Sequence, residues 1–433
     1  MPFIRSIGRW TMTALVINMI IGSGIFGLPS ELSRLLGRAS PIAFVFAAFT
    51  MGVIMLCMAE VASQFSEPGG PYLYLRTAFG RFAGTQVAWF HLLAMIGTGA
   101  ATIALFMAYL GGVLPVAARG WQRLVILSLV VVAPLAANYI GVRSGANFTS
   151  LLTVAKLLPL ILLISLGVLH FSHHFEIIKL SDITSSTASS WLTALLLMVF
   201  TFGGFEDAII PAGEVERPRH TIPFALLVGL LFCTVVYTLV QLVTVVTIGT
   251  SVTGRPLAQT ASVLISGGSM IVTIAALIST FGTFSSCLLN CPRLMCSLAS
   301  QGDFPPFFER LHPRFNTPAR ALVFYGLVVW LLALSGTFVW AAMITGASAV
   351  LIYAGTCAAP IRLRKQNPSA DALRIPFGLV LAVTGFVIAL SPLSQLDIRQ
   401  ALLMGVTAVI AAGNWFWAKR WAIEHQPPQD GLP

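Results

Sequence analysis

Long apolar segments recur along the whole chain, and they constrain its fold more than any other feature. A helix of about 20 apolar residues is long enough to cross the hydrocarbon core of a bilayer. The chain has 433 residues but only 25 Lys and Arg and 15 Asp and Glu side chains, whereas a soluble protein of this length carries about 110 charges. So few charges cannot cover a surface in water. The pattern excludes a soluble globular protein and predicts an all-α integral membrane protein.

Hydropathy predicts twelve transmembrane helices. They cover residues 10–36, 40–63, 82–114, 121–139, 146–170, 191–212, 221–249, 262–298, 318–334, 338–361, 377–393 and 399–421. An even count places both termini on one side. Seventeen basic residues fall on that side and seven on the other, so we expect the N- and C-termini to be cytoplasmic in a multi-pass protein of the plasma membrane, the inner membrane of a bacterium.

The hydrophilic connections are too short for a second domain, so residues 1–433 are predicted to form a single transmembrane domain. The basic residues stand singly or in pairs, a distribution that argues against a nucleic-acid partner and leaves membrane lipid as the expected surroundings. No cofactor or metal site is predicted, because the six cysteines lack metal-ligand spacing.

Two of the predicted helices are interrupted near their middle. In the first, Gly22, Ser23 and Gly24 interrupt the apolar run, and in the sixth Gly203 and Gly204 do so. Each glycine in a helix interior costs about 1 kcal/mol relative to alanine. Unpaired backbone at membrane depth is tolerated only where it lines a cavity or is buried in protein. Glycines that only allow close helix packing are the alternative, but paired breaks in corresponding helices favour a secondary transporter.

The two breaks offer complementary backbone groups. The first exposes the amides of Ser23, Gly24 and Ile25 at the positive end of a half-helix, which attracts a carboxylate. The second exposes the carbonyls of Phe200, Thr201 and Phe202, which accept from an ammonium group. The pattern predicts a site for a zwitterion such as an α-amino acid or a related amine.

These segments, with several further motifs, resemble the amino acid-polyamine-organocation superfamily of permeases. The superfamily pattern I-G-x-G-I-F appears at residues 21–26, G-F-E at 204–206, E-V-x-x-P at 214–218, I-P at 222–223 and T-P at 317–318. The loop pattern P-x-G-G-x-Y-x-Y has a close counterpart at 68–74. The pattern D-G-x-x-P has a close counterpart at 303–305. Together they extend over nearly the whole chain.

The resemblance implies the leucine-transporter-type fold, in which helices 1–5 and 6–10 form two inverted repeats. The repeats would cover residues 10–170 and 191–361, with peripheral helices at 377–421. It also implies a substrate site formed by both breaks. Its residues would be Ile20, Gly22, Ser23, Gly24, Ile25, Phe200, Thr201, Phe202, Gly203 and Phe205, with Phe202 or Phe205 as the cap.

Two intramembrane charges are candidates for proton coupling. Lys156 lies about ten residues into the fifth helix, where a permanent charge is costly. We therefore expect its amine to bind and release a proton. Some members of the superfamily hold a lysine amine there in place of sodium, so a proton is the expected coupling ion; a lysine fixed permanently by carbonyls is the alternative. Glu206, directly after the second break, is either a proton relay or structural. Glu60 is interpreted as a helix-end carboxylate paired with backbone amides or arginines.

The predicted function is a secondary active transporter that carries amino acids by alternating access, with proton coupling or exchange. The alternatives are a polyamine or other organic-amine transporter of the same fold, or a channel. An enzyme is excluded because the sequence contains no H-E-x-x-H motif, no G-x-S-x-G motif and no pair of aspartates at helical spacing. Asp207 places a second carboxyl beside Glu206 and would favour cationic substrates if it faced the site. His91 is interpreted as a hydrogen-bonded interior histidine.

Overall fold

In the computed structural model, residues 7–65, 70–140, 146–171, 186–209, 215–250, 253–366 and 373–424 are described. Pro68 and Gly69 of the loop motif, and Glu214 of the motif after the second break, lie outside these residues. Apart from an isolated bridge between Ile7 and Val215, the regular structure of the described residues is helical.

The helices follow one another through short connections. They are α1 (Arg9–Ile20), α2 (Gly24–Gly27), α3 (Pro29–Leu36), α4 (Ser40–Ala62), α5 (Gly70–Phe79), α6 (Arg81–Leu110), α7 (Gly120–Ile140), α8 (Ala146–Phe171), α10 (Ala188–Phe202), α11 (Phe205–Ala208), α12 (Pro218–Ile248), α13 (Pro256–Leu264), α14 (Gly268–Ser300), α15 (Ala319–Ser335), α16 (Phe338–Gln366), α17 (Gly378–Leu390) and α18 (Ile398–Glu424).

Ten segments of the described chain are long and apolar enough to cross a membrane, which confirms a multi-pass membrane protein. They fall on ten of the twelve predicted segments. The other two predicted segments correspond to shorter apolar helices at Lys156–His170 and Ala319–Ser335. The predicted eighth segment, 262–298, does not begin at residue 262: α14 begins at Gly268, because Gly267 adopts a φ of +79° and separates it from α13.

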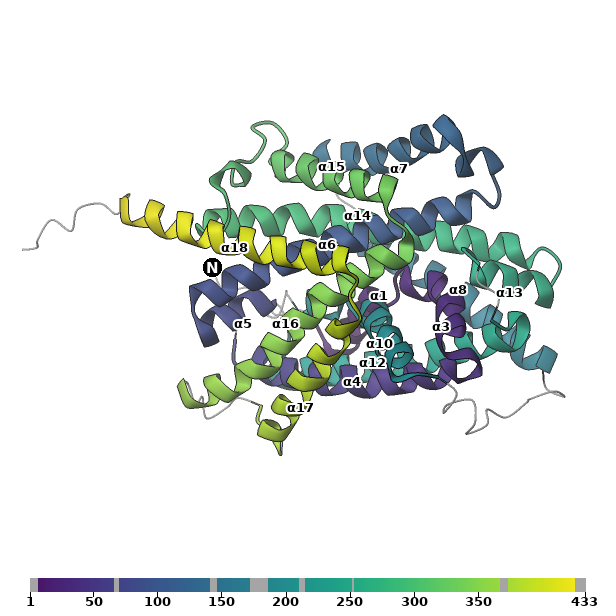
Figure 1. Cartoon of the computed structure of the whole chain (residues 1–433), viewed down its shortest axis with the longest axis horizontal. Coiled ribbons are helices and arrows are strands. Elements are labelled where there is room, and N and C mark those ends of the chain that lie inside the picture. Colours follow the sequence, from purple (N-terminus) through teal and green to yellow (C-terminus); the bar gives the residue numbers. More distant parts are fainter. Residues whose placement is uncertain are drawn as a thin grey trace, which may run out of the picture.

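The interrupted helices α1 and α10 lie near the centre of the bundle (Figure 1). Helix α1 packs against α12, and α10 packs against α16 and α4. Helix α6 contacts both α14 and α16. The segments that carry the breaks are therefore enclosed by long helices, as irregular backbone at membrane depth requires.

Glu60, at the end of α4, is held by groups around α16. Arg364 donates to both of its carboxylate oxygens over 2.6 and 2.8 Å, and the amide of Ile375 donates over 3.2 Å. Such a bidentate pair fixes the arginine plane against the carboxylate. The interpretation of Glu60 as a helix-end carboxylate is confirmed.

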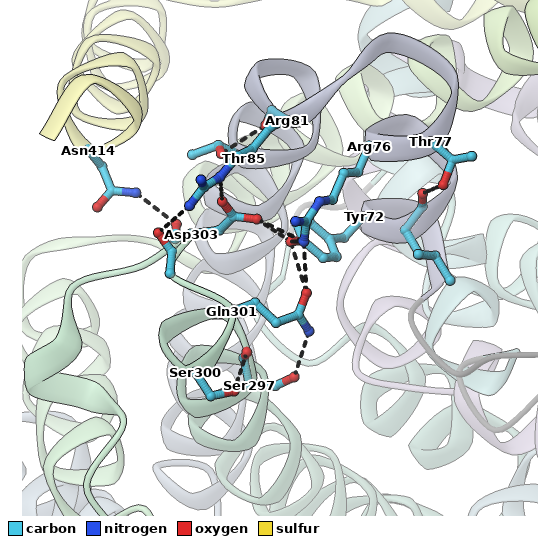
Figure 2. Close-up of polar contacts among 12 residues, drawn as sticks. Tyr72, Arg76, Thr77, Arg81, Thr85, Ser297, Ser300, Gln301, Asp303 and Asn414 are labelled. Atoms are coloured by element: carbon cyan, nitrogen blue, oxygen red, sulfur yellow. Dashed lines mark hydrogen bonds and ion pairs between the residues drawn. The ribbon is translucent and has the colours of Figure 1, made fainter. Parts of the chain in front are cut away.

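A second polar cluster joins the start of α6 to the connection after α14 (Figure 2). The buried carboxylate of Asp303 pairs with Arg76 at 3.2 Å and with Arg81, and it accepts from the hydroxyl of Tyr72. Burial, and then the nearby Asp303, raise the pKa of the Tyr72 phenol well above its ordinary value, so it remains a donor. Asn414 of α18 donates to the Asp303 carbonyl over 2.7 Å.

Candidate functional site

The first break separates α1 from α2. Helix α1 ends at Ile20, whose carbonyl accepts from the hydroxyl of Tyr237 on α12 over 3.0 Å. Residues 21–23 are not helical, and the chain resumes its helical course at Gly24. Among the described residues, the amides of Ser23, Gly24 and Ile25 have no hydrogen-bond partner, as expected for the first amides of a helix.

The second break separates α10 from α11. Gly203 is extended, and Gly204 adopts a φ of +96°, a left-handed conformation that favours glycine. Helix α10 ends at Phe202, so the carbonyls of its last turn lose their intrahelical donors. Within the described part of the chain, no other donor reaches the carbonyls of Phe200, Thr201 or Phe202.

The two breaks are in direct contact. A Cβ atom on Gly24 would lie 2.9 Å from the Cα of Thr201, and one on Gly204 would lie 2.7 Å from the carbonyl oxygen of Met19. Both distances are shorter than normal van der Waals contact. The glycines therefore allow α1 and α10 to approach at the point where both are interrupted.

A cavity of about 110 Å³ lies at this contact, which is room for several water-sized groups. It is lined by eight of the twelve residues predicted for the site: Ile20, Gly22, Ser23, Gly24, Phe200, Thr201, Gly203 and Glu206. Backbone donors from one break and backbone acceptors from the other thus face one small space.

The other four predicted residues do not line this cavity. Ile25, Phe202 and Phe205 are fully buried in the apolar core. The ring of Phe202 contacts Tyr237, and that of Phe205 contacts Tyr353. Neither phenylalanine caps the cavity. Successive residues of a helix point about 100° apart, so the neighbours of a lining residue face elsewhere.

Lys156 lies on α8, which packs against α14, and it is 6% exposed. Its amine lies 3.5 Å from Oδ1 of Asn18, two residues before the end of α1. The amine therefore contacts the half-helix that leads into the first break.

Glu206 is buried directly behind the second break. Its Oε2 accepts from the amide of Gly204 over 3.0 Å and from the hydroxyl of Tyr353 over 2.9 Å. The carboxylate thereby holds the backbone of the break and links it to α16. It also lines the cavity, so it is placed both to stabilise the break and to contact a bound molecule.

Further polar residues of the cavity wall were not among the predicted site residues, because the faces of their helices could not be assigned from sequence. They are His91 and Thr98 of α6, Thr283, Ser286 and Asn290 of α14, Thr345 of α16 and Asp207 of α11. Nε2 of His91 lies 3.1 Å from Oδ1 of Asp207. His91 is therefore a hydrogen-bonded interior histidine, as interpreted, and Asp207 faces the cavity, which the sequence left open.

Comparison with known proteins places almost the whole chain in one family. A family model described as amino acid permease matches residues 7–418. The chain is also similar to the serine/threonine exchanger SteT of Bacillus subtilis (strain 168), with 27% identity over 336 residues that cover 74% of each protein.

Two other relatives are also amino acid transporters by name. The branched-chain amino acid permease BcaP of Bacillus subtilis (strain 168) is 26% identical over 392 residues, which cover 84% of this chain and 82% of the relative. Asc-type amino acid transporter 1 of Mus musculus is 28% identical over 340 residues, which cover 74% of this chain and 63% of the relative.

Proposed function

The chain belongs to the amino acid permease family, and from this premise we propose that it is a secondary active transporter that carries amino acids across the plasma membrane by alternating access. Members of this family are transporters and not enzymes. The proposal includes twelve spans, of which helices 1–5 and 6–10 form inverted repeats, and cytoplasmic N- and C-termini.

The observation that carries the proposal is the meeting of two helix breaks at one cavity. The free amides of Ser23 and Gly24 attract a carboxylate, and the free carbonyls of Phe200 and Thr201 accept from an ammonium group. An α-amino acid presents both groups on the same carbon atom. Interrupted helices around a central site are typical of alternating access, because the half-helices can move relative to the rest of the bundle.

We also propose that transport is coupled to protons or runs as exchange. The contact between Lys156 and Asn18 supports an interaction with α1 whose strength depends on protonation of the lysine. Glu206 offers a second protonatable group at the cavity. The relatives do not narrow the substrate, since one is named for serine and threonine and another for branched-chain amino acids.

A counterflow experiment tests the proposal. Proteoliposomes loaded with a mixture of unlabelled amino acids are expected to take up external labelled amino acids saturably, and faster than empty vesicles. Flux that rises without saturation would indicate a channel. Uptake driven by internal putrescine but not by amino acids would indicate an amine transporter.

A matched pair of glycine variants connects this activity to the breaks. Gly24→Ala places a Cβ atom against Thr201. We expect it to reduce counterflow at least about tenfold, because the first break can accommodate this atom only by moving away from the second. Gly413→Ala in α18 has no atom within 4 Å of the new Cβ and is expected to retain wild-type flux. Equal flux from both variants would contradict a transport site at the breaks.

A further inference from the structure

Five of the six hydroxyl side chains that line the cavity donate their proton to a carbonyl of their own helix; the sixth, Ser23, contacts the hydroxyl of Thr102 over 3.2 Å. Thr98 donates to Ala94 over 2.9 Å, and Thr283 donates to Ser279 over 3.0 Å. The same pattern holds for three more: Ser286 to Gly282, Thr201 to Leu197 and Thr345 to Ala341. A hydroxyl has only one proton, so these side chains present lone pairs to the cavity.

The pair of His91 and Asp207 adds a charged acceptor to this wall. An ionised carboxylate only accepts, so the contact of Oδ1 with His91 uses the ring N–H as donor. In the described part of the chain, the second oxygen of Asp207, Oδ2, has no hydrogen-bond partner. The side chain is 19% exposed and lines the cavity, so this oxygen is available to a bound molecule.

This acceptor comes from other elements than the free amides of the first break: Asp207 lies on α11 and His91 on α6, whereas Gly24 begins α2. His91 lies two turns before Thr98 on α6, and Asp207 lies three residues beyond Gly204 on α11. A carboxylate held by the amides of Ser23 and Gly24 and an ammonium held by the carbonyls of Phe200 and Thr201 leave the side chain of the substrate to face the remaining wall. That wall offers hydroxyl lone pairs, the amide of Asn290 and Oδ2 of Asp207.

We propose that this wall selects amino acids whose short side chain ends in a hydrogen-bond donor, and that Asp207 is the specificity-determining residue that accepts this bond. The inference rests on the proposed transport of amino acids and adds the substrate class. A site built to bond a donor leaves its own buried acceptor unpaired when an apolar isostere binds, so it rejects that isostere strongly. Acidic side chains are rejected because Glu206 and Asp207 repel them.

Threonine and valine form the decisive comparison, because they have nearly the same shape and differ in one donor. We expect unlabelled threonine to compete with labelled serine in counterflow at least about tenfold better than valine does. In Asp207→Ala, this preference is expected to fall to about twofold or less. In Asp207→Asn, which keeps an acceptor oxygen, part of the preference should remain.

Asp397→Asn serves as the matched control, because Asp397 accepts from the amide of Gln400 at the start of α18, away from the cavity. This variant is expected to keep the wild-type preference. The wild-type comparison is informative even if Asp207→Ala fails to fold. Wild-type protein that exchanges both amino acids equally overturns the inference and leaves the proposed function intact, whereas absence of exchange with every amino acid overturns both.

Discussion

At the scale of single residues, glycines decide how closely the two interrupted helices approach. Gly204 has two independent requirements: its φ of +96° is strained for any residue with a Cβ, and that Cβ would lie 2.7 Å from the carbonyl of Met19. Neither requirement concerns helix propensity alone. Gly204 thus joins the local conformation of the second break to the packing of α11 against α1.

We expect Gly204→Ala to destabilise the protein by about 1–2 kcal/mol through its backbone conformation alone, and by more through contact with Met19. Thermal melting of purified protein measures this effect. Gly405→Ala in α18 provides the control, because no atom lies within 4 Å of its added Cβ and alanine is a better helix former. Its melting temperature should stay unchanged or rise, and a similar fall in both variants would contradict the argument.

At the scale of elements, buried polar clusters fasten helices that are distant in sequence. The carboxylate of Asp303 is fully buried, while the two arginines that contact it are about one-third exposed: 34% for Arg76 and 33% for Arg81. The cluster therefore ties α5 and α6 to the connection between α14 and α15 (Figure 2). In the proposed fold, this joins the first repeat to the second.

Asp303→Asn is expected to lower stability by about 1–3 kcal/mol, because a buried acceptor of charged hydrogen bonds is lost while the arginines remain partly solvated. Thermal melting again provides the measurement. Glu31→Gln removes the ion pair with Arg34, whose side chain is 52% exposed, and an exposed pair contributes about 0–1 kcal/mol. If both variants melted at the same temperature, the Asp303 cluster would not stabilise the packing of these helices.

At the scale of the whole molecule, the proposed transport cycle requires that a proton change the relation between α1 and the surrounding bundle. Lys156 is placed for this role by its contact with Asn18 and its position beside α14. A protonated amine donates to the Asn18 carbonyl oxygen, whereas a neutral amine holds it more weakly. Loss of the proton would then release the half-helix before the first break.

We therefore expect Lys156→Ala to flatten the pH dependence of amino acid counterflow. The measurement is initial counterflow rate in proteoliposomes over a series of matched internal and external pH values. Lys365→Ala, which removes an exposed lysine near the end of α16, should reproduce the wild-type profile. An unchanged profile in Lys156→Ala would show that the lysine is a permanent clamp without a coupling role.

The positions of the breaks could be predicted because their cause is local. Glycines at 22, 24, 203 and 204 weaken a helix wherever it lies, and the structure interrupts both helices there. The faces of α6, α14 and α16 could not be predicted, since in a membrane helix the lipid-facing side is as apolar as the side packed against protein, and the sequence carries little amphipathic signal. Thr98, Thr283 and Thr345 were missed for this reason, as was the orientation of Phe202 and Phe205.

The sequence by itself determined the membrane as solvent, the approximate spans and the places where two helices must stop, because these depend on composition and local propensity. Only the tertiary structure decided which side chains share the cavity, that Asp207 pairs with His91 across two helices, and that Lys156 contacts α1. These contacts depend on how each helix is rotated about its axis. Packing against its neighbours sets this rotation, and that information is spread over the whole chain.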